Sequence, residues 1–488
     1  MNHTPTPEQA AIIEAARSTS DNLLVSALAG AAKTTTLEMV CHTITDIPIL
    51  SLAFNKRIAD EMAKRLPGHV KAQTMNSLGH GVWSKVVGRR LMVDTNKMRM
   101  LLANSIKALP KAAQGEAWSA QAEVLSWLRA AKRDGYIPPK WRDKAPWHCG
   151  DADDWLEPYP EVPTPAMLDL INAILAASIE AAYAGGIDFD DQIYMPVCFG
   201  GAWPKYPLVM IDEFQDLNAL QHQMLASLAV RRLIGVGDPW QSIYGFRGAK
   251  QNGMAAARER WNMRELTLST TFRVPRTGVE RAWFRVPHMR WWDGAADGNI
   301  VKLEEWDHSD IRDGSAIICR NNAPLFTAGL RLLRRGRAIK LVGMDIGAGL
   351  VRILRKLGPI SMTPPAINAA LQAWMVEALH NAKREETVQE KMECLTVLTA
   401  PQHDQWTLGE AIARAEDLFR RDGPIQLLSA HKSKGLEWDT VYHLDPWRIP
   451  SRFAKEGTEE YEQELNCRYV LETRFKKNLF LIDTKGWV

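Results

Sequence analysis

Cysteine is scarce in this chain and shows no metal-binding pattern. The 488 residues include only six cysteines, which are dispersed and never spaced C-x-x-C. This distribution argues against a disulfide framework and against a tetrahedral zinc site. We therefore expect a protein of a reducing, cytoplasmic compartment.

Long apolar runs and a strong net charge are also missing. No apolar run approaches the roughly 18 residues that a membrane span needs, and the N-terminal MNHTPTPEQA has no apolar signal-sequence core. The net charge is only +3, which gives no global basic field for nucleic acid, although a local groove can still be basic. These absences predict a soluble intracellular protein without a membrane partner.

Tryptophan is the one residue type in excess. The chain has 18 tryptophans, and many lie beside basic residues, as in Arg290-Trp291-Trp292. Taken alone, this pattern indicates packing in cores and interfaces more often than stacking on bases.

Short apolar runs alternate with segments of helical spacing along the chain. Each run is short enough for one strand and ends at a polar or glycine-containing turn, which is typical of a parallel α/β sheet that binds ligands at the C-terminal ends of its strands. Two sets of runs predict two α/β lobes, interrupted by helical stretches at about 86–175 and 346–423. The predicted strands are 22–27, 47–54, 206–212, 231–238, 315–320, 338–343, 425–430, 440–445 and 478–483.

The stretch SALAGAAKTTT (26–36) has the outline of a phosphate-binding loop. Ala27 and Ala32 stand where the pattern G-x-x-x-x-G-K-[ST] has glycine. The stretch nevertheless follows a predicted strand and precedes a predicted helix, so that backbone N–H groups would face phosphates. In a working loop Lys33 would reach the β- and γ-phosphates and Thr34 would bind Mg²⁺. A chance alanine-rich turn explains the stretch equally well when it is taken alone.

Paired acids give a second indication of a nucleotide site. The run MIDEFQD places Asp212 and Glu213 at the end of a predicted strand, where Asp212 can hold the metal and Glu213 can accept a proton from the attacking water. A charge cluster at a helix N-terminus is the alternative. Downstream, GDPWQSIYGFRGA (237–249) has Gln241 placed to sense the γ-phosphate, and its aromatic residues can stack on unpaired bases.

The ordered motifs resemble superfamily 1 helicases of the UvrD/Rep type. The blocks that carry the resemblance are TPEQ, AAKTT, LAFNKRIADEM, QTMNSLG, DFDDQI, IDEFQD, GDPWQSIYGFRGA, LSTTFRVP, IICRNNA, SAHKSKGLEWDTV and ELNCRYVLETRFKKNLFLI. The chain is most similar to the branch with the F-box DNA helicases in the segments AFNK, HKSKGLEW and L-N-x-x-Y-V. We expect no F-box, because the chain begins almost at the TPEQ block.

The resemblance implies an α/β fold with two RecA-like parallel-sheet lobes and helical insertions. Because the stretch available for the second insertion is short, that insertion is expected to be reduced. The implied segments are lobe 1A at 1–85 and 176–278, insertion 1B at 86–175, lobe 2A at 279–345 and 424–488, and insertion 2B at 346–423.

The resemblance also implies ATP and Mg²⁺ as cofactors. Arg273 and Arg474 match two family arginines that reach the γ-phosphate, where an arginine finger is worth roughly 10³–10⁵ in rate; a solvated surface cation is the alternative for either. The implied catalytic residues are Lys33, Glu213, Gln241, Arg273 and Arg474. The implied nucleotide-binding residues are Gln9 and Phe272 at the base, then Gly30, Ala31, Ala32, Lys33, Thr34, Thr35, Arg273, Glu437 and Arg474, with Thr34 and Asp212 at the metal.

For DNA, the resemblance implies sequence-independent binding of a single strand and of junctions between single and double strands. Stacking is worth about 1–3 kcal/mol per base and tolerates any sequence, while polar side chains and backbone N–H groups hold phosphates. The implied DNA-binding residues are Phe54, Asn55, Lys56, Thr74, Asn76, Tyr244, Phe246, Arg247 and His431, the last with neighbouring Lys432 and Ser433.

Several positions depart from the family pattern. Ala32 replaces the glycine before the lysine, Thr35 an arginine that often flanks the adenine, Asn76 a histidine and Phe475 an alanine. If Ala32 must be left-handed, its Cβ costs roughly 1–2 kcal/mol, which is about a tenfold loss of affinity at most. We therefore expect an active site with weaker nucleotide binding.

The motifs together predict a monomeric DNA-dependent ATPase that moves 3′ to 5′ on single-stranded DNA and separates the duplex ahead of it. The alternative is an ATP-gated single-strand-binding or protein-stripping factor with little unwinding. Because the second insertion is reduced, translocation is a safer expectation than processive unwinding.

Overall fold

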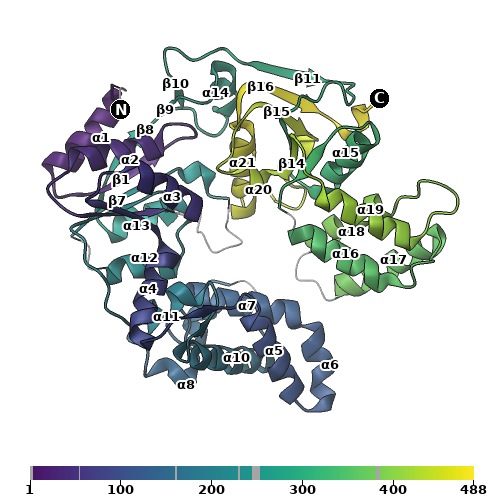
Figure 1. Cartoon of the computed structure of the whole chain (residues 1–488), viewed down its shortest axis with the longest axis horizontal. Helices are drawn as coiled ribbons and strands as arrows, with labels where there is room; N and C mark the ends of the chain where they lie inside the picture. Colours follow the sequence, from purple (N-terminus) through teal and green to yellow (C-terminus); the bar gives the residue numbers. More distant parts are fainter. Residues whose placement is uncertain are drawn as a thin grey trace. The chain divides into compact units, whose positions relative to one another are not determined.

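The structure is a computed structural model that describes residues 4–53, 55–159, 162–228, 231–243, 253–343, 345–380 and 385–488. The chain forms two compact units, Met1–Ala27 with Ala32–Leu268 and Leu28–Ala31 with Ser269–Val488. Each unit contains a six-stranded sheet, and the strand pairs of the described residues are parallel (Figure 1). The predicted α/β class with two parallel-sheet lobes is confirmed, whereas the boundaries of the four segments stay a prediction.

The sheet of the first unit has the strand order β3-β2-β6-β7-β1-β8. Its four inner strands are the predicted apolar runs, because strands covered on both faces must be apolar throughout. The strands are β1 (Asn22–Ala27), β2 (Ile49–Ala53), β3 (Val70–Thr74), β6 (Leu208–Ile211), β7 (Arg232–Gly237) and β8 (Met263–Leu268). The helices that accompany them are α1 (Pro7–Ser18), α2 (Lys33–Thr43), α3 (Lys56–Arg65), α4 (Met75–Val87), α11 (Asp191–Cys198), α12 (Ala219–Ser227) and α13 (Gly253–Arg260).

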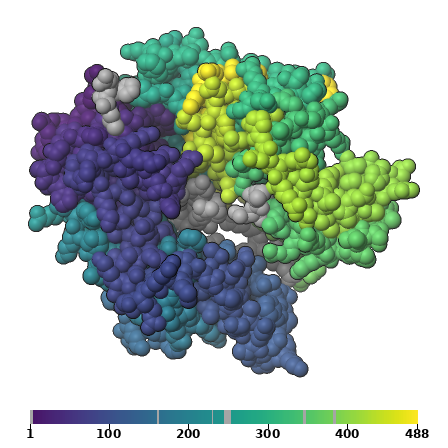
Figure 2. All heavy atoms as spheres, viewed as in Figure 1, coloured from purple at the N-terminus to yellow at the C-terminus, as the bar shows by residue number. Residues whose placement is uncertain are grey.

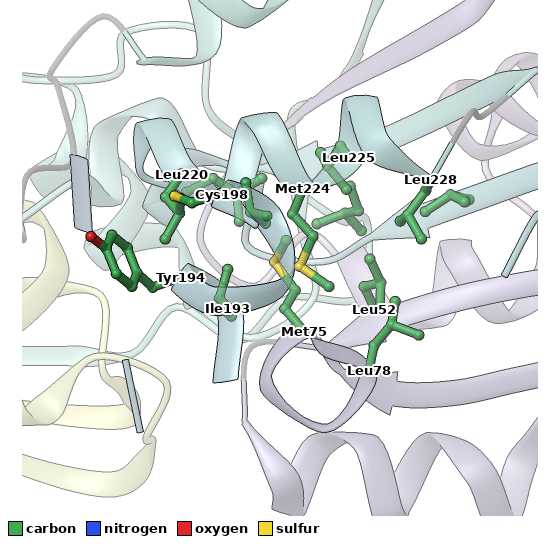
Figure 3. Close-up of a cluster of buried hydrophobic side chains, with 14 of the residues drawn as sticks. Leu52, Met75, Leu78, Ile193, Tyr194, Cys198, Leu220, Met224, Leu225 and Leu228 are labelled. Atoms are coloured by element: carbon green, nitrogen blue, oxygen red, sulfur yellow. The ribbon is translucent and has the colours of Figure 1, made fainter. Parts of the chain in front are cut away.

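An apolar core joins three of these helices to the sheet. Met75 of α4, Ile193 of α11 and Met224 of α12 are buried together with Leu52 of β2 (Figure 3). Burying a side chain of this kind is worth about 1.5–3 kcal/mol. This core fixes the helices that begin near the C-terminal ends of the strands, where the candidate site residues lie.

A helical segment interrupts the first unit and protrudes from its sheet (blue in Figures 1 and 2). Lys97 and Lys132 of this segment are buried against carboxylates of the DFDDQI block. Lys97 Nζ lies 2.6 Å from Asp191 Oδ2, and Lys132 Nζ lies 2.7 Å from both Asp188 Oδ2 and Asp191 Oδ1. The elements are β4 (Met92–Val93), α5 (Lys97–Ala108), α6 (Lys111–Ser119), α7 (Gln121–Asp134), α8 (Pro139–Arg142), α9 (Ala152–Leu156), α10 (Pro165–Tyr183) and β5 (Gly186–Ile187).

Helix α10 contains no uninterrupted apolar run of membrane-spanning length, because Asp169, Asn172 and Glu180 lie among its apolar residues. Its 19 residues are long and apolar enough to cross a membrane by length and composition alone. Ile171, Ile174 and Leu175 of α10 are buried in a cluster with Leu128 of α7. A buried core helix passes the same test of length and composition, because it too is apolar on much of its surface.

The sheet of the second unit has the strand order β11-β16-β15-β12-β14-β13. Its strands are β11 (Asn299–Leu303), β12 (Ala316–Cys319), β13 (Ile339–Leu341), β14 (Ile425–Ser429), β15 (Trp438–Leu444) and β16 (Phe475–Ile482), and a separate small sheet pairs β9 (Thr270–Thr271) with β10 (Arg290–Trp291). Its helices are α14 (Arg276–Ala282), α15 (Asn322–Arg334), α20 (Ala430–Ser433) and α21 (Glu459–Glu472), and the interrupting group is α16 (Asp345–Leu357), α17 (Pro364–His380), α18 (Glu385–Thr399) and α19 (Leu408–Arg420).

One buried carboxylate ties the helices of the second unit to its sheet. Glu472 at the end of α21 is 2 % exposed. Its Oε1 lies 2.8 Å from Arg281 Nη2, 3.3 Å from Arg468 Nε and 3.5 Å from His443 Nδ1. These contacts connect α14, α21 and β15 immediately before Thr473 and Arg474 in the chain.

Candidate functional site

The loop before helix α2 has the strand–loop–helix form of a phosphate-binding loop. Gly30 has a φ of 73° and Ala32 a φ of 57°, so both are left-handed. A Cβ on Gly30 would lie 2.5 Å from Thr271 Oγ1, so only glycine fits there. Ala32 is the N-cap residue of α2 and makes no side-chain cap. The first N–H groups of α2 are therefore oriented as donors for an anion.

The two predicted metal ligands lie together in the first unit. Thr34 Oγ1 donates a hydrogen bond to Asp212 Oδ2 at 3.1 Å. Burial and the neighbouring Glu213 raise the pKa of Asp212, while Lys33 acts in the opposite direction. A hydroxyl and a carboxylate at this spacing fit the hard oxygen ligands of Mg²⁺. A cation held here would offset the cost of burying the Asp212 charge.

Glu213 belongs to a hydrogen-bond chain that reaches Gln241. Gln215 Nε2 donates to Glu213 Oε2 at 2.6 Å, and the backbone N–H of Asp238 donates to Gln215 Oε1 at 3.0 Å. Gln241 Nε2 donates to Asp238 Oδ2 at 2.7 Å. The structure thus connects the predicted base with the predicted γ-phosphate sensor. Sequence reasoning missed Gln215, although its place in the IDEFQD block was a usable signal.

Gln9 is buried, and its amide is oriented by residues of its own unit. Thr6 N–H donates to Gln9 Oε1 at 3.0 Å, and Gln9 Nε2 donates to Thr36 Oγ1 at 3.1 Å. The first contact is half of a capping box at the start of α1. A structural role therefore accounts for Gln9, and its predicted role at the adenine stays a prediction.

In the second unit, two predicted nucleotide-binding residues are paired with each other. Arg273 Nη1 lies 3.2 Å from Glu437 Oε2, and Lys476 Nζ lies 2.6 Å from Glu437 Oε1. Burial alone would raise the pKa of Glu437, but Lys476 and Arg273 outweigh it and lower the pKa. Phe272, directly before Arg273, has a half-exposed ring. Its backbone N–H donates to Gly30 O at 2.9 Å, within the same unit.

Arg474 is buried, so the alternative of a solvated surface cation is wrong for this arginine. Arg474 is only 1 % exposed. The guanidinium donates to the carbonyl oxygen of Val470 at 2.6 Å and to Thr473 Oγ1 at 2.9 Å. These bonds anchor the side chain to the end of α21, and its contact with a γ-phosphate stays a prediction.

Several predicted DNA-binding residues lie at one edge of the first sheet. Strands β2 and β3 are parallel, and Ala53 pairs with Thr74, so the residues after both strands emerge at the same edge. Asn55 and Lys56 are exposed at the start of α3. Asn76 Nδ2 donates to the carbonyl oxygen of Phe189 at 2.9 Å.

Phe189 is a candidate that sequence reasoning missed. Its side chain is 57 % exposed, although Asp188 and Asp191 beside it are buried. An exposed ring whose backbone is fixed by Asn76 suits stacking on an unpaired base. The aromatic residue inside the acidic DFDDQI block was the signal that could have found it.

His431 lies on α20 of the second unit. Burial, and then the charge of Arg320, lower the pKa of His431 to about 3. The imidazole is therefore neutral at pH 7 and cannot attract a phosphate by charge. The remaining predicted DNA-binding residues, Phe54, Tyr244, Phe246 and Arg247, lie outside the described residues.

The fold and the site together define an α/β protein with two parallel-sheet units and a lysine-containing phosphate loop. A family model described as the UvrD/REP helicase N-terminal domain matches residues 183–262, and the UvrD-like helicase C-terminal domain matches residues 370–486. The chain therefore contains segments that are similar to the N-terminal and C-terminal domains of UvrD-like helicases.

Several curated relatives are similar to this chain over much of its length. F-box DNA helicase protein 1 of Schizosaccharomyces pombe is 24 % identical, over 98 % of this chain and 57 % of the relative. The ATP-dependent DNA helicase PcrA of Leuconostoc citreum is 24 % identical, over 74 % of this chain and 53 % of the relative. F-box DNA helicase 1 of Gallus gallus is 23 % identical, over 94 % and 47 %. The chain thus spans about half the length of these relatives.

Proposed function

We propose that this chain is an ATP-dependent DNA helicase or translocase that moves 3′ to 5′ along single-stranded DNA as a monomer. The observation that carries the proposal is the Thr34–Asp212 pair at 3.1 Å, with Glu213 next in the chain. Phosphoryl-transfer sites of this class need a hydroxyl and a carboxylate for the metal and a residue that orients the attacking water. The names of the relatives support ATP and DNA as the substrates.

The proposed chemistry follows from the residues of the first unit. Lys33 and the N-terminus of α2 would bind the phosphates, and Thr34 with Asp212 would hold Mg²⁺. The bound metal ion would supply positive charge to the phosphate oxygens. Glu213, oriented by Gln215, would accept the proton of the attacking water. Arg273 and Arg474 of the second unit are the proposed arginines for the γ-phosphate.

The proposed DNA-binding surface of the first unit combines polar residues with a ring. Asn55, Lys56 and Thr74 would hold phosphates without reading bases. Phe189, fixed through Asn76, would stack on one base. Such a surface tolerates any sequence, as a motor that advances along DNA requires.

The test is ATP turnover with and without single-stranded DNA. The wild type is expected to hydrolyse ATP faster with DNA, and Glu213→Gln is expected to lower the rate by about 10²–10⁴, the usual contribution of a general base. Glu265→Gln is the matched control, because Glu265 is an exposed residue of β8 whose Oε2 lies 2.6 Å from Nη1 of the exposed Arg258. Turnover that DNA does not stimulate, or that Glu213→Gln leaves intact, would refute the proposal.

The strained Ala32 favours keeping the second candidate, an ATP-gated single-strand-binding or protein-stripping factor with little unwinding. A forked duplex and a streptavidin-blocked single strand separate the two candidates. Displacement of streptavidin without opening of the fork would support the stripping factor. Tight DNA binding with an ATPase rate equal to that of Lys33→Ala would support the passive binder.

A further inference from the structure

The small sheet β9–β10 (Figure 1) is followed in each strand by an aromatic residue, and the side chains of these two residues are neighbours. In this parallel pair Trp291 is the partner of Thr271, so the following residues, Phe272 and Trp292, are also neighbours. The backbone N–H of Trp292 donates to Thr271 O at 3.3 Å. The centroids of the two rings are 6.4 Å apart, and their planes are tilted by 34°.

Both rings are open to solvent, unlike the neighbouring tryptophan. Phe272 is 43 % exposed and Trp292 is 44 % exposed. Trp291 is instead stacked against Trp283 with centroids 6.1 Å apart. Two adjacent rings of this exposure present a continuous aromatic surface. A planar ligand that stacked on this surface would bury it and be stabilised by the stacking.

The backbone holds Trp292 in its place. A Cβ on Gly294 would lie 2.1 Å from the Cη2 atom of Trp292, so the chain folds back closely against the indole ring. The ladder hydrogen bond to Thr271 fixes the backbone on the other side. An indole held in this way loses little conformational entropy when it binds a ligand.

The surroundings of Phe272 indicate which ligand the rings would bind. Its N–H donates to Gly30 O at 2.9 Å, and Arg273 Cβ would lie 2.7 Å from a Cβ on Gly30. Gly30 belongs to the phosphate loop and to the same compact unit as the two rings. Gly30 and Ala31 are proposed nucleotide-binding residues of this unit, so a planar group attached to phosphates at these two residues would lie within reach of the rings.

We propose that Trp292 extends the stacking surface of Phe272 and binds the purine base of the nucleotide. This inference rests on the proposed nucleotide site. The contribution of Trp292 is to affinity for the base, and it does not take part in phosphoryl transfer. The dissociation constant of ATP should therefore depend on the indole, while the turnover number at saturating ATP should not.

The experiment compares Trp292→Ala with the matched control Trp283→Ala, which removes a similarly exposed indole from the same segment. Affinities for ATP and for ribose 5′-triphosphate, which lacks the base, are measured by calorimetry. Loss of one stacked aromatic ring weakens base binding by at least about fivefold. Trp292→Ala should show this loss for ATP, less than a twofold change for ribose triphosphate, and an unchanged turnover number. Trp283→Ala should match the wild type, and Trp292→Phe should recover most of the affinity.

Each other outcome overturns the inference. Unchanged ATP affinity in Trp292→Ala would exclude a role at the base, and an equal loss for both ligands would indicate a distorted loop. A selective loss of single-stranded DNA affinity would assign the ring to DNA instead. If Trp292→Ala fails to fold, Trp292→Leu keeps the apolar volume without the aromatic face and tests the same loss. Wild type that binds neither ligand would refute the proposed nucleotide site itself, whereas wild type that binds ATP independently of Trp292 would refute only this inference.

Discussion

Replacing Ala32 with glycine should stabilise the folded chain, because Ala32 is left-handed in the structure. Its φ is 57° and its ψ is 40°, a conformation that costs an L-residue with a Cβ roughly 1–2 kcal/mol. Glycine removes this cost, but it also gains conformational freedom in the unfolded chain, which opposes folding by about 0.5–1 kcal/mol. The expected net gain is therefore about 0.5–1 kcal/mol.

A neighbouring alanine separates the two contributions. Ala31 is buried and does not belong to the residues with positive φ, so Ala31→Gly gains the freedom of the unfolded chain without any relief of strain. It also loses a buried methyl group, worth about 0.8 kcal/mol. Ala31→Gly should therefore destabilise the chain by about 1–2 kcal/mol, and the two variants should differ by at least the cost of the left-handed alanine.

Urea unfolding and ATP binding measure the effect. With a slope of about 3 kcal/mol per molar urea, Ala32→Gly should raise the midpoint by about 0.2–0.3 M and Ala31→Gly should lower it. The affinity for ATP should be unchanged or up to about tenfold higher in Ala32→Gly. Equal destabilisation by both substitutions, or a large loss of ATP affinity in Ala32→Gly, would refute the reasoning about this loop.

Two further predictions concern buried charges. Lys132→Met should destabilise the first unit by about 3–5 kcal/mol in urea unfolding, because it removes the cation that contacts the buried Asp188 and leaves the buried Asp191 with Lys97 alone. The exposed pair Lys140–Glu180 is the control, and Lys140→Met should cost under about 1 kcal/mol. Burial alone would raise the pKa of Glu472, but His443 and the two arginines outweigh burial and lower the pKa from 4.5 to about 2. The stability that this carboxylate contributes is present above about pH 4.5 and is lost as the pH falls toward 2, so Glu472→Gln should flatten the pH dependence of unfolding in that window; an unchanged slope would contradict the assignment.

The inner strands could be predicted from the sequence, whereas several edge strands could not. Strands β1, β6 and β7 are buried almost throughout, so their apolar runs stand out in the sequence. Strands β3 and β11 lie at sheet edges and are largely half-exposed or exposed. Their sequences, VKAQT and NIVKL, therefore lack a continuous apolar run, and no local pattern distinguishes them from a loop.

The candidate site could likewise be predicted where it follows from the order of strands in the sequence, but not where it depends on side-chain packing. Thr34 and Asp212 each follow a predicted strand, and parallel strands bring their C-terminal ends to one edge, so their proximity could be expected. The link through Gln215 and the burial of Arg474 could not be, because both depend on the packing of side chains from separate segments. Hydrogen-bond partners in separate segments do not produce a periodic pattern in the sequence, so such patterns cannot predict them.

Backbone strain identifies the candidate site independently of any resemblance. The described non-glycine residues with positive φ are Ala32, Glu213, Asn262 and Asp445. Asparagine and aspartate tolerate this region, because their short polar side chains bond locally, whereas alanine and glutamate do not share this advantage. Ala32 lies two residues before Thr34, and Glu213 directly follows Asp212. Strained residues persist only where the surrounding structure imposes their conformation, and they cluster at functional sites. The strain of about 1–2 kcal/mol at Ala32 and at Glu213 therefore supports a functional site at the Thr34–Asp212 pair, which these two residues flank. The urea experiment on Ala32 therefore tests this argument as well, because it measures whether that strain exists.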